Sequence, residues 1–280
     1  MKFITQVYIL FMVLIGCKDH NSKVGEIKSE LETGKIEKVT VSITENSFEA
    51  PENVPAGYVD IELVNQTNEL HSAHLIKLED GYSTKQLIKA YVDSSRTGGA
   101  RPSWMIHRGG VISENGKANV TLLLEPGNYT WVCVMGSDTE PHFAGIEHKG
   151  VVVSGRVDDQ IELPKPDVTI VMTDENHQLN SKIKSGSQAI DVVNSGSKYH
   201  LAAISKLNPD ATQKDVINWF STFAGPPPAK GVGVTSAIGP GLSARLNLNF
   251  EPGTYVLYCM ANAEGTYHIL EEAISTFTVE

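Results

Sequence analysis

Apolar and polar residues alternate along several short stretches of the chain. In the stretch that begins at Val39, valine and isoleucine occupy every second position and threonine or serine the positions between. Similar alternation occupies residues 58–64, 120–124, 129–133 and 150–153. Side chains two positions apart share one face of a β-strand, so each stretch predicts a strand with one buried face. Many short strands joined by Gly and Pro turns predict an all-β fold of the sandwich type.

A helical pattern interrupts the strands twice. Apolar residues three and four positions apart follow Ser83 and, in the second half of the chain, Thr212. This spacing forms one stripe on a helix, and serine or threonine is a preferred N-cap residue. Gln86 can complete a capping box with Ser83. We expect each helix to be a short insertion that covers one end of a sandwich, with a packing role.

The two halves of the chain repeat each other. Residues 39–78 align without a gap onto residues 168–207, and the Glu-Pro-Gly turn at Glu125 recurs at Glu251. A period of this length indicates a duplicated domain, because solenoid repeats are much shorter. The predicted domains and their linker are residues 38–154, 155–166 and 167–280.

The charge of the chain restricts its partners. The 280 residues carry a formal net charge of -10. Such a balance argues against binding to nucleic acid and to anionic membrane surfaces. The length is sufficient for two domains that each bury a core.

The N-terminus has the pattern of a targeting segment. A mostly apolar run from residue 3 to residue 15, too short to span a bilayer, ends in the tetrapeptide Leu-Ile-Gly-Cys. This tetrapeptide resembles a bacterial lipobox, in which the cysteine is acylated. We therefore expect a signal peptide at residues 1–16, a lipid on Cys17 and a flexible tether over residues 17–37.

The expected location follows from the lipid anchor. Lys18, rather than aspartate, follows the cysteine, so retention at the inner membrane is not indicated. We expect the protein to be anchored in the bacterial cell envelope, at the outer membrane, and to face the periplasm or the cell surface.

One cysteine and two histidines occupy equivalent positions in the two copies. The two sets are His71, Cys133 and His142 in the first copy and His200, Cys259 and His268 in the second. In both copies, eight residues separate the cysteine from the second histidine. Thiolate and imidazole together favour copper, and a His₂Cys set with a weak axial ligand is typical of electron-transfer sites. Zinc or Cu(I) could occupy the same ligands.

Two further possibilities receive less support: His74 as a metal ligand, and a disulfide between Cys133 and Cys259. His74 lies on the opposite strand face from His71 and aligns with Ala203, so we interpret it as a surface or edge histidine. Cys133 and Cys259 occupy equivalent positions in tandem domains. Such positions rarely approach to the Cα separation of about 7 Å that a disulfide requires.

On these residues, the chain resembles the cupredoxin family over most of both domains. The sequences around His71 (LHSA) and His200 (YHLA) look like the first ligand element of that family. The loop of eight residues between cysteine and histidine is similar to the type 1 site of copper nitrite reductases, which also carry two cupredoxin domains. The resemblance implies two tandem Greek-key cupredoxin-like β-sandwiches, with one copper ion in each domain held by the two sets above.

The chain departs from the family at the axial position. The methionine expected there is replaced by Glu147 in the first copy and Ala273 in the second. Glu147, or the adjacent His148, could act as a weak axial donor, so copper is favoured in the first domain. The second copper of nitrite reductases requires a histidine just before the cysteine, where this chain has Val132 and Tyr258.

The sequence therefore favours an electron carrier or copper-binding protein over an enzyme, and no catalytic residues are assigned. We expect an envelope lipoprotein that transfers single electrons or holds copper. Its partners would be the membrane, through the lipid anchor, and a redox protein. The alternative is a metal-free β-sandwich module that binds other molecules at the cell envelope.

Overall fold

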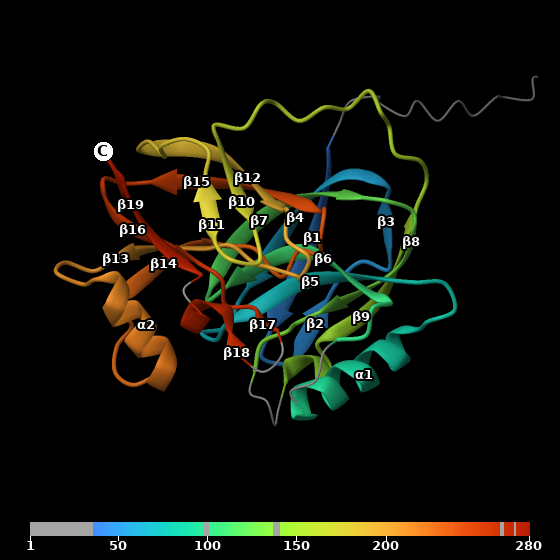
Figure 1. Cartoon of the computed structure of the whole chain (residues 1–280). Coiled ribbons are helices and arrows are strands. Elements are labelled where there is room, and N and C mark those ends of the chain that lie inside the picture. The colour runs from blue at the N-terminus through green and yellow to red at the C-terminus, as the bar shows by residue number, and fades with distance from the viewer. Residues whose placement is uncertain (1–35, 98–100, 137–140, 264–265, 272) are drawn as a thin grey trace, which may run out of the picture. The chain divides into compact units, whose positions relative to one another are not determined.

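The computed structural model describes residues 36–97, 101–136, 141–263, 266–271 and 273–280 (Figure 1). The predicted signal peptide, Cys17 and most of the tether lie outside the described residues. Within the described part of the chain, no helix combines the length and the apolar character needed to cross a membrane.

Strands dominate the described residues. The first repeat contains β1 (Glu37–Thr44), β2 (Ser47–Glu49), β3 (Asn53–Pro55), β4 (Gly57–Asn65), β5 (His71–Leu78), β6 (Met105–Ser113), β7 (Gly116–Leu124), β8 (Gly127–Val132) and β9 (His148–Ser154). The second contains β10 (Val168–Met172), β11 (His177–Leu179), β12 (Gly186–Asn194), β13 (Ala203–Leu207), β14 (Ala229–Val234), β15 (Ser243–Phe250), β16 (Gly253–Tyr258), β17 (Asn262–Ala263), β18 (Thr266–Tyr267) and β19 (Ile274–Val279). The helices are α1 (Thr84–Thr97), α2 (Gln213–Thr222) and the short 3₁₀ helices η1 (His142–Ala144) and η2 (His268–Glu271).

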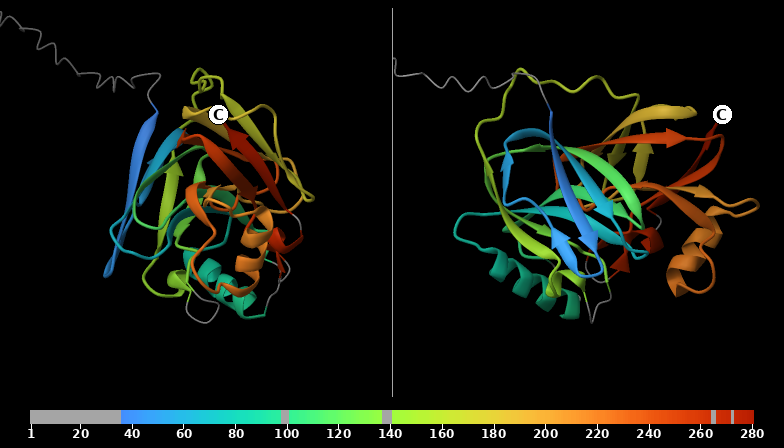
Figure 2. Two further views of the ribbon diagram at one scale, coloured as in Figure 1. Left: turned by 90° about the vertical axis from the view of Figure 1, so that its left-hand side faces the viewer. Right: turned by 180° about the vertical axis from the view of Figure 1, so that it is seen from behind.

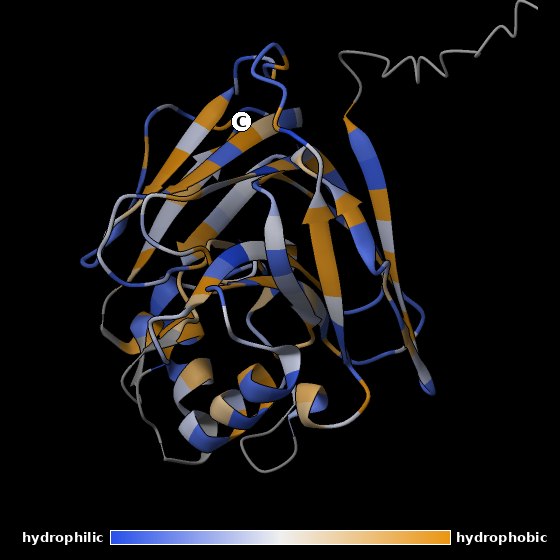
Figure 3. Cartoon of the chain, turned by 90° about the vertical axis from the view of Figure 1, so that its right-hand side faces the viewer, coloured by the Kyte–Doolittle hydropathy of each residue, from blue (hydrophilic) through white to orange (hydrophobic). Residues whose placement is uncertain are grey.

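Each repeat forms a sandwich of two sheets. In the first, β7-β4-β1-β2 packs against the sheet β3-β9-β8-β5-β6, and in the second, β11-β10-β12-β15 packs against β14-β13-β16-β19. Alternate residues such as Val41 and Ile43 of β1, and Trp131 of β8, fill the space between the sheets. The alternation of apolar and polar positions is visible along the strands in Figure 3. The predicted all-β class, with two tandem sandwiches that each carry a short helix, is confirmed.

The two sandwiches share one sheet. β7 pairs antiparallel with β15 through Leu122 and Ala244 and through Thr121 and Arg245. The resulting order is β11-β10-β12-β15-β7-β4-β1-β2, and a single core cluster includes residues of both repeats. Contacts group Thr33–Glu280 into one compact unit, so the domain boundaries at residues 154 and 167 stay a prediction.

The predicted helix starts are confirmed. Ser83 and Gln86 form the expected capping box, with the Ser83 backbone N–H 3.0 Å from Gln86 Oε1. Thr212 caps α2 in the same way, with Asp215 as its partner. These bonds satisfy N–H groups that have no partner within the helix itself.

The helices cover a different surface from the one predicted. Leu87 and Tyr91 of α1 pack against Ile76, Val132 and Phe143, on the outer face of the five-stranded sheet. The expectation that the helix covers one end of the sandwich is therefore wrong. Figures 1 and 2 show both helices on one side of the molecule and the segment between β9 and β10 on the opposite side.

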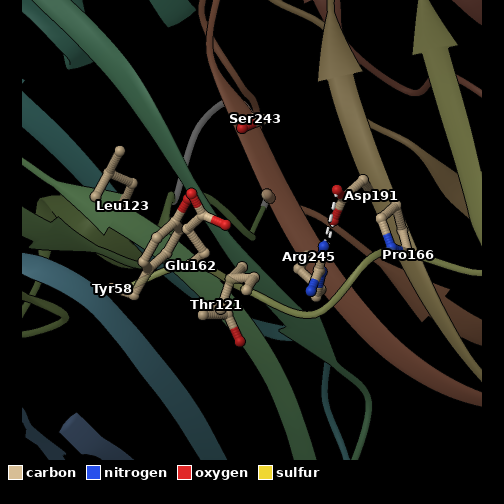
Figure 4. A pocket seen from close by; sticks show the side chains of 10 residues that line it. Tyr58, Thr121, Leu123, Glu162, Pro166, Asp191, Ser243 and Arg245 are labelled. Atoms are coloured by element: carbon tan, nitrogen blue, oxygen red, sulfur yellow. Dashed lines mark hydrogen bonds and ion pairs between the residues drawn. The ribbon is translucent and has the colours of Figure 1, made fainter. Parts of the chain in front are cut away.

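A polar pocket lies under the segment that joins the repeats (Figure 4). Arg245 binds both carboxylate oxygens of Asp191 at 2.6 and 2.9 Å and donates to the Pro164 carbonyl at 2.6 Å. Tyr58 and Glu162 also line it, and no cysteine or histidine is found among the described residues around it. It therefore lacks the ligands of a soft metal.

Candidate metal centres

The sheet order brings the predicted ligands of the first repeat together. His71 is the first residue of β5, and Cys133 follows the last residue of the adjacent strand β8. His142 begins η1, and its backbone N–H donates to the Met135 carbonyl at 3.0 Å. Glu147 precedes β9, which pairs with the other edge of β8. Two strand ends and the start of η1 therefore meet at one point, and we call these residues, His71, Cys133, His142 and Glu147, the first site.

Sulfur and nitrogen atoms of the first site lie at ligand spacing. Cys133 Sγ is 3.6 Å from Nδ1 of His71 and 3.6 Å from Nδ1 of His142. Glu147 Oε2 lies 2.9 Å from His71 Nδ1 and 3.6 Å from His142 Nδ1. His148, the other predicted axial donor, directs its Nδ1 to the Phe143 carbonyl at 2.9 Å. Of these two residues, Glu147 is the one that reaches the cluster.

The second repeat forms the same three-residue cluster, which we call the second site. Cys259 Sγ is 3.8 Å from His200 Nδ1 and 3.5 Å from His268 Nδ1. Cys259 follows β16 and His268 begins η2, as in the first repeat. All three side chains are buried. The structure thus brings the predicted ligands of each repeat together in a cluster of their own.

The spacing fits a single bound ion. Sulfur and nitrogen ligands at about 2.3 and 2.0 Å from one ion, near tetrahedral or trigonal angles, stand about 3.5–3.8 Å apart. The four sulfur-to-nitrogen distances of the two sites, between 3.5 and 3.8 Å, lie within this range. The donor types, two imidazoles and one thiol, are those that bind copper and zinc.

Both thiols are buried and free of disulfides. Burial, followed by the charge of Glu147, raises the pKa of Cys133 to about 12, and burial raises that of Cys259 to about 11. Backbone N–H groups of Ser72 and Leu201 lie 3.2 and 3.5 Å from the two sulfur atoms. These donors and a nearby cation favour the thiolate, which is the metal-binding form.

The carboxylates of the two sites lie at different positions. Cys133 N–H donates to the Glu147 carbonyl, and Cys259 N–H donates to the Ala273 carbonyl, each at 3.0 Å. The two axial positions are therefore equivalent in backbone geometry, but the alanine of the second site offers no oxygen to an ion. Instead, the Asp174 carboxylate lies 2.9 Å from His200 Nε2, on the side of the ring that faces away from the sulfur. Hydrogen bonds from His200 and then Ser197 hold the pKa of Asp174 well below its usual range.

Sequence reasoning missed Asp174. It aligns with Glu45, so it does not belong to the set of residues that both copies share. Its place in a polar turn before a short strand resembles many solvated aspartates. The sequence contains no signal that sets it apart.

The interpretation of His74 as a surface or edge histidine is wrong. His74 is fully buried, and its Nε2 lies 3.0 Å from Nδ1 of His107, which is also buried. The ring of His107 lies 4.5 Å from that of Tyr199, in the second repeat. Burial lowers the pKa of His74 to about 3 and that of His107 well below its usual value. The face of β5 that carries His74 is covered by α1 and the second repeat, which the alternation pattern alone does not reveal.

Comparison with known proteins gives structural neighbours only. No family model matches the chain, and no curated protein matches it. The auracyanin of Roseiflexus castenholzii is 25% identical, with 40% of this chain and 94% of that chain covered and a TM-score of 0.28. Auracyanin A of Chloroflexus aurantiacus is 13% identical, with 42% and 98% covered and a TM-score of 0.30. Copper nitrite reductase of Nitrosomonas europaea is 15% identical, with 88% and 94% covered and a TM-score of 0.27.

These neighbours are cupredoxin-fold proteins, in agreement with the cupredoxin-like architecture predicted from the sequence. The two auracyanin matches cover 40% and 42% of this chain, whereas the nitrite reductase match covers 88%.

Proposed function

We propose that the chain is a copper-binding protein that takes one ion in each repeat and serves single-electron transfer or copper holding. The observation that carries this proposal is the convergence of one Sγ and two Nδ1 atoms in both repeats. If the three residues served only to pack the core, the two repeats would not be expected to retain the same donor atoms at the same spacing. The first site is favoured, since Glu147 adds a fourth donor.

The residues around each sulfur prepare it for a soft ion. Copper, when bound, supplies a one-electron change between Cu(I) and Cu(II). Rigid strands β5 and β8 fix the first histidine and the cysteine of the first site, and β16 fixes the cysteine of the second. Val132 and Phe143, the chain neighbours of Cys133 and His142, are buried, whereas His142 and Glu147 are partly exposed. The N–H donors at Ser72 and Leu201 stabilise negative charge on sulfur.

The proposed setting is the bacterial cell envelope. A signal peptide at residues 1–16 and a lipid on Cys17 would anchor the protein, with outer-membrane placement facing the periplasm or the cell surface. A redox protein would be the partner for electron transfer. The sequence at the N-terminus is the support for this setting.

Titration with copper tests the metal sites. The full chain with Cys17→Ser, which removes the third thiol, is titrated with Cu(II) while thiolate-to-copper charge-transfer absorption is recorded. We expect up to two equivalents to bind, Cys133→Ser and Cys259→Ser each to remove one, and the double variant to remove both. Absence of the band, together with equal copper uptake by the double variant, would contradict the proposal.

The burial of the two thiols is also consistent with the alternative, a metal-free interaction module. A buried cysteine with a raised pKa can act as a small apolar residue. In that case, both thiols resist alkylation whether or not copper is present. For metal sites, we expect bound copper to lower the alkylation rate of both thiols below that of the metal-free protein, whereas in a metal-free module copper leaves the rate unchanged.

A further inference from the structure

We propose that Asp174 is the positioning residue of the second site and holds the ring of His200 with its Nδ1 free for the metal. This inference rests on the proposed function, since it assigns a role toward the same ion. The role belongs to the second repeat alone.

Asp174 is itself held in place. It lies in the turn between β10 and β11, and its carboxylate accepts the backbone N–H of Ser197 at 2.9 and 3.0 Å and that of Lys198 at 3.1 Å. The Ser197 hydroxyl adds a bond of 2.6 Å. These donors belong to the loop that leads into His200. The carboxylate therefore fixes both the ring and the backbone that carries it.

The contact with Asp174 determines which nitrogen of His200 carries the proton. A carboxylate can only accept a hydrogen bond, so Nε2, at 2.9 Å from Asp174 Oδ1, must be the protonated nitrogen. In the neutral ring the lone pair is then on Nδ1, which faces Cys259 Sγ at 3.8 Å. Metal-bound histidines usually donate their other N–H to such an outer partner, and this bond sets the orientation of the ring.

The space for this contact depends on a glycine. A Cβ added at Gly196 would lie 2.4 Å from Asp174 Oδ1 and 3.0 Å from His200 Nε2. Any larger residue would therefore push the carboxylate or the ring out of place. The first repeat has Thr67 at the aligned position.

The first repeat lacks the arrangement. Glu45 aligns with Asp174, but it is exposed, and no hydrogen bond or ion pair within the described residues joins it to His71. The carboxylate that contacts His71 is Glu147, which lies at Nδ1, the nitrogen on the sulfur side. The carboxylate of the first site therefore contacts the ring nitrogen that faces the sulfur, whereas the carboxylate of the second site contacts the opposite nitrogen.

The first test uses the metal-free protein. The full chain with Cys17→Ser is labelled with ¹⁵N-histidine, and two-bond proton–nitrogen correlations report the tautomer of each ring. We expect His200 to be protonated at Nε2 in the parent protein and to become a mixture of tautomers in Asp174→Ala. Glu45→Gln, the change at the aligned position, should leave the tautomer of His71 unchanged.

The second test measures the affinity of the second site for Cu(I) alone. Cys133→Ser removes the first site, and a chelator of known affinity competes for the ion. We expect Asp174→Ala to weaken binding by about 10–100-fold, the range typical for loss of an outer hydrogen bond to a metal ligand. Asp174→Asn keeps an acceptor oxygen and should weaken binding by less. It also serves as the test variant if Asp174→Ala does not fold.

The two tests separate the inference from the function on which it rests. An Nδ1-protonated His200 in the parent protein, or an unchanged tautomer and unchanged affinity in both Asp174 variants, overturns the role of Asp174. If the tautomer depends on Asp174 but the parent site takes up no Cu(I), the proposed function is contradicted, while the role of Asp174 in orienting the ring of His200 is retained.

Discussion

At the scale of single residues, the two sites share three donors and differ in the position of one carboxylate. In the first site the Glu147 carboxylate contacts His71 at Nδ1, on the side of the sulfur, whereas in the second the Asp174 carboxylate contacts His200 at Nε2, on the opposite side of the ring. A thiolate and a carboxylate together match the charge of a divalent ion, whereas a thiolate alone matches that of a monovalent ion. The first site should therefore depend on its carboxylate for divalent ions.

Replacing Glu147 tests this dependence. Glu147→Gln keeps the size of the side chain and removes its charge. We expect the affinity of the first site for Cu(II) to fall about tenfold, equivalent to about 1.4 kcal/mol. The measurement is a competition titration in a Cys259→Ser background, where the first site is the remaining Cys/His site. The same change in a Cys133→Ser background should leave the second site unaffected, and a loss there would contradict a local role.

The residues that both copies retain could be found from the sequence, and Glu147 could be found from the family resemblance, but Asp174 and the burial of His74 could not. The cysteine and two histidines of each site stood out because both copies retain them at equal spacing. Asp174 has glutamate as its counterpart, and His74 has Ala203, so neither belongs to the shared set. Their surroundings come from loops and from the other repeat, which a period along the chain does not describe.

At the scale of elements, the contact between β5 and β6 depends on an irregular step in β6. The register of the pair shifts between Leu75 and Ile76, and Gly109 and Gly110 lie opposite this shift with φ of 106° and 150°. These values favour glycine, since other residues rarely adopt them. The shift lets the strand pass close to the backbone of β5 next to His74.

Gly110 is therefore expected to resist substitution. A Cβ there would lie 2.0 Å from the Ala73 carbonyl oxygen, which is backbone and cannot turn away. Gly116 also has a positive φ, of 71°, but nothing lies within 4 Å of its Cβ position. Gly116→Ala should lower the free energy of unfolding by about 1–2 kcal/mol through backbone strain alone. Gly110→Ala should lower it by about 2 kcal/mol more through overpacking.

Urea unfolding of the metal-free protein measures both changes, provided that the dependence of the unfolding free energy on urea concentration (the m-value) is the same in all variants. Equal losses in the two variants would show that the close approach at Gly110 relaxes without cost.

Elements that depend on local signals were predictable. The alternating stretches all fall within strands β1, β4, β7, β8 and β9, apart from Cys133 at the end of its stretch. Ser83 and Thr212 cap their helices as the sequence indicates, because a cap involves residues three positions apart. The face that each helix covers depends on contacts between distant segments, and here the expectation failed.

At the scale of the whole molecule, the pairing of β7 with β15 makes one structure of two repeats. Neither strand carries a signal for this pairing, since an exposed strand edge accepts any partner in register. The sequence therefore predicted two separate sandwiches, and the structure joins them. Near the junction, Arg245 lies opposite Thr121, binds Asp191 and donates to the carbonyl of Pro164.

This contact should stabilise the linker against the joined sheet. Asp191→Asn leaves the guanidinium of Arg245, with a side chain 8% exposed, opposite a neutral amide. We expect the free energy of unfolding to fall by about 1–2 kcal/mol. This is the contribution of a hydrogen bond between charged groups, reduced because Asp191 is partly exposed to solvent. The pair of Lys206 and Glu251 provides the control, because Glu251 is exposed and Glu251→Gln should cause no measurable change. Chemical denaturation measures both, and equal results would exclude a role for Arg245 in holding the linker.

The buried histidine pair between the repeats should make stability depend on pH. Burial, the positive charge of Arg101 and the mutual effect of His74 and His107 all oppose protonation of His107, while the rings of Tyr91 and Tyr199 pack against it. In the unfolded chain, each histidine binds a proton below its ordinary pKa of 6.5. In the folded protein, His74 stays neutral until the pH approaches 3. The folded state thus keeps its full stability above pH 6.5 and loses it as the pH falls.

His74, whose pKa falls to about 3, should contribute about 2 kcal/mol to the loss between pH 7 and pH 5, and His107 should add to that loss. His107→Leu removes one of the two groups, so its loss over this interval should be smaller than that of the parent protein. Ile76→Val, in the adjacent core cluster, is the matched control. It removes a methyl group but no titrating group, and should lower stability by about 0.5–1.5 kcal/mol at both pH values. Denaturation curves of the three proteins at pH 7 and pH 5 decide the matter. If the parent protein and His107→Leu lose the same stability, the pair takes up protons in the folded state, and the contact between the repeats at His107 and Tyr199 must be open to water.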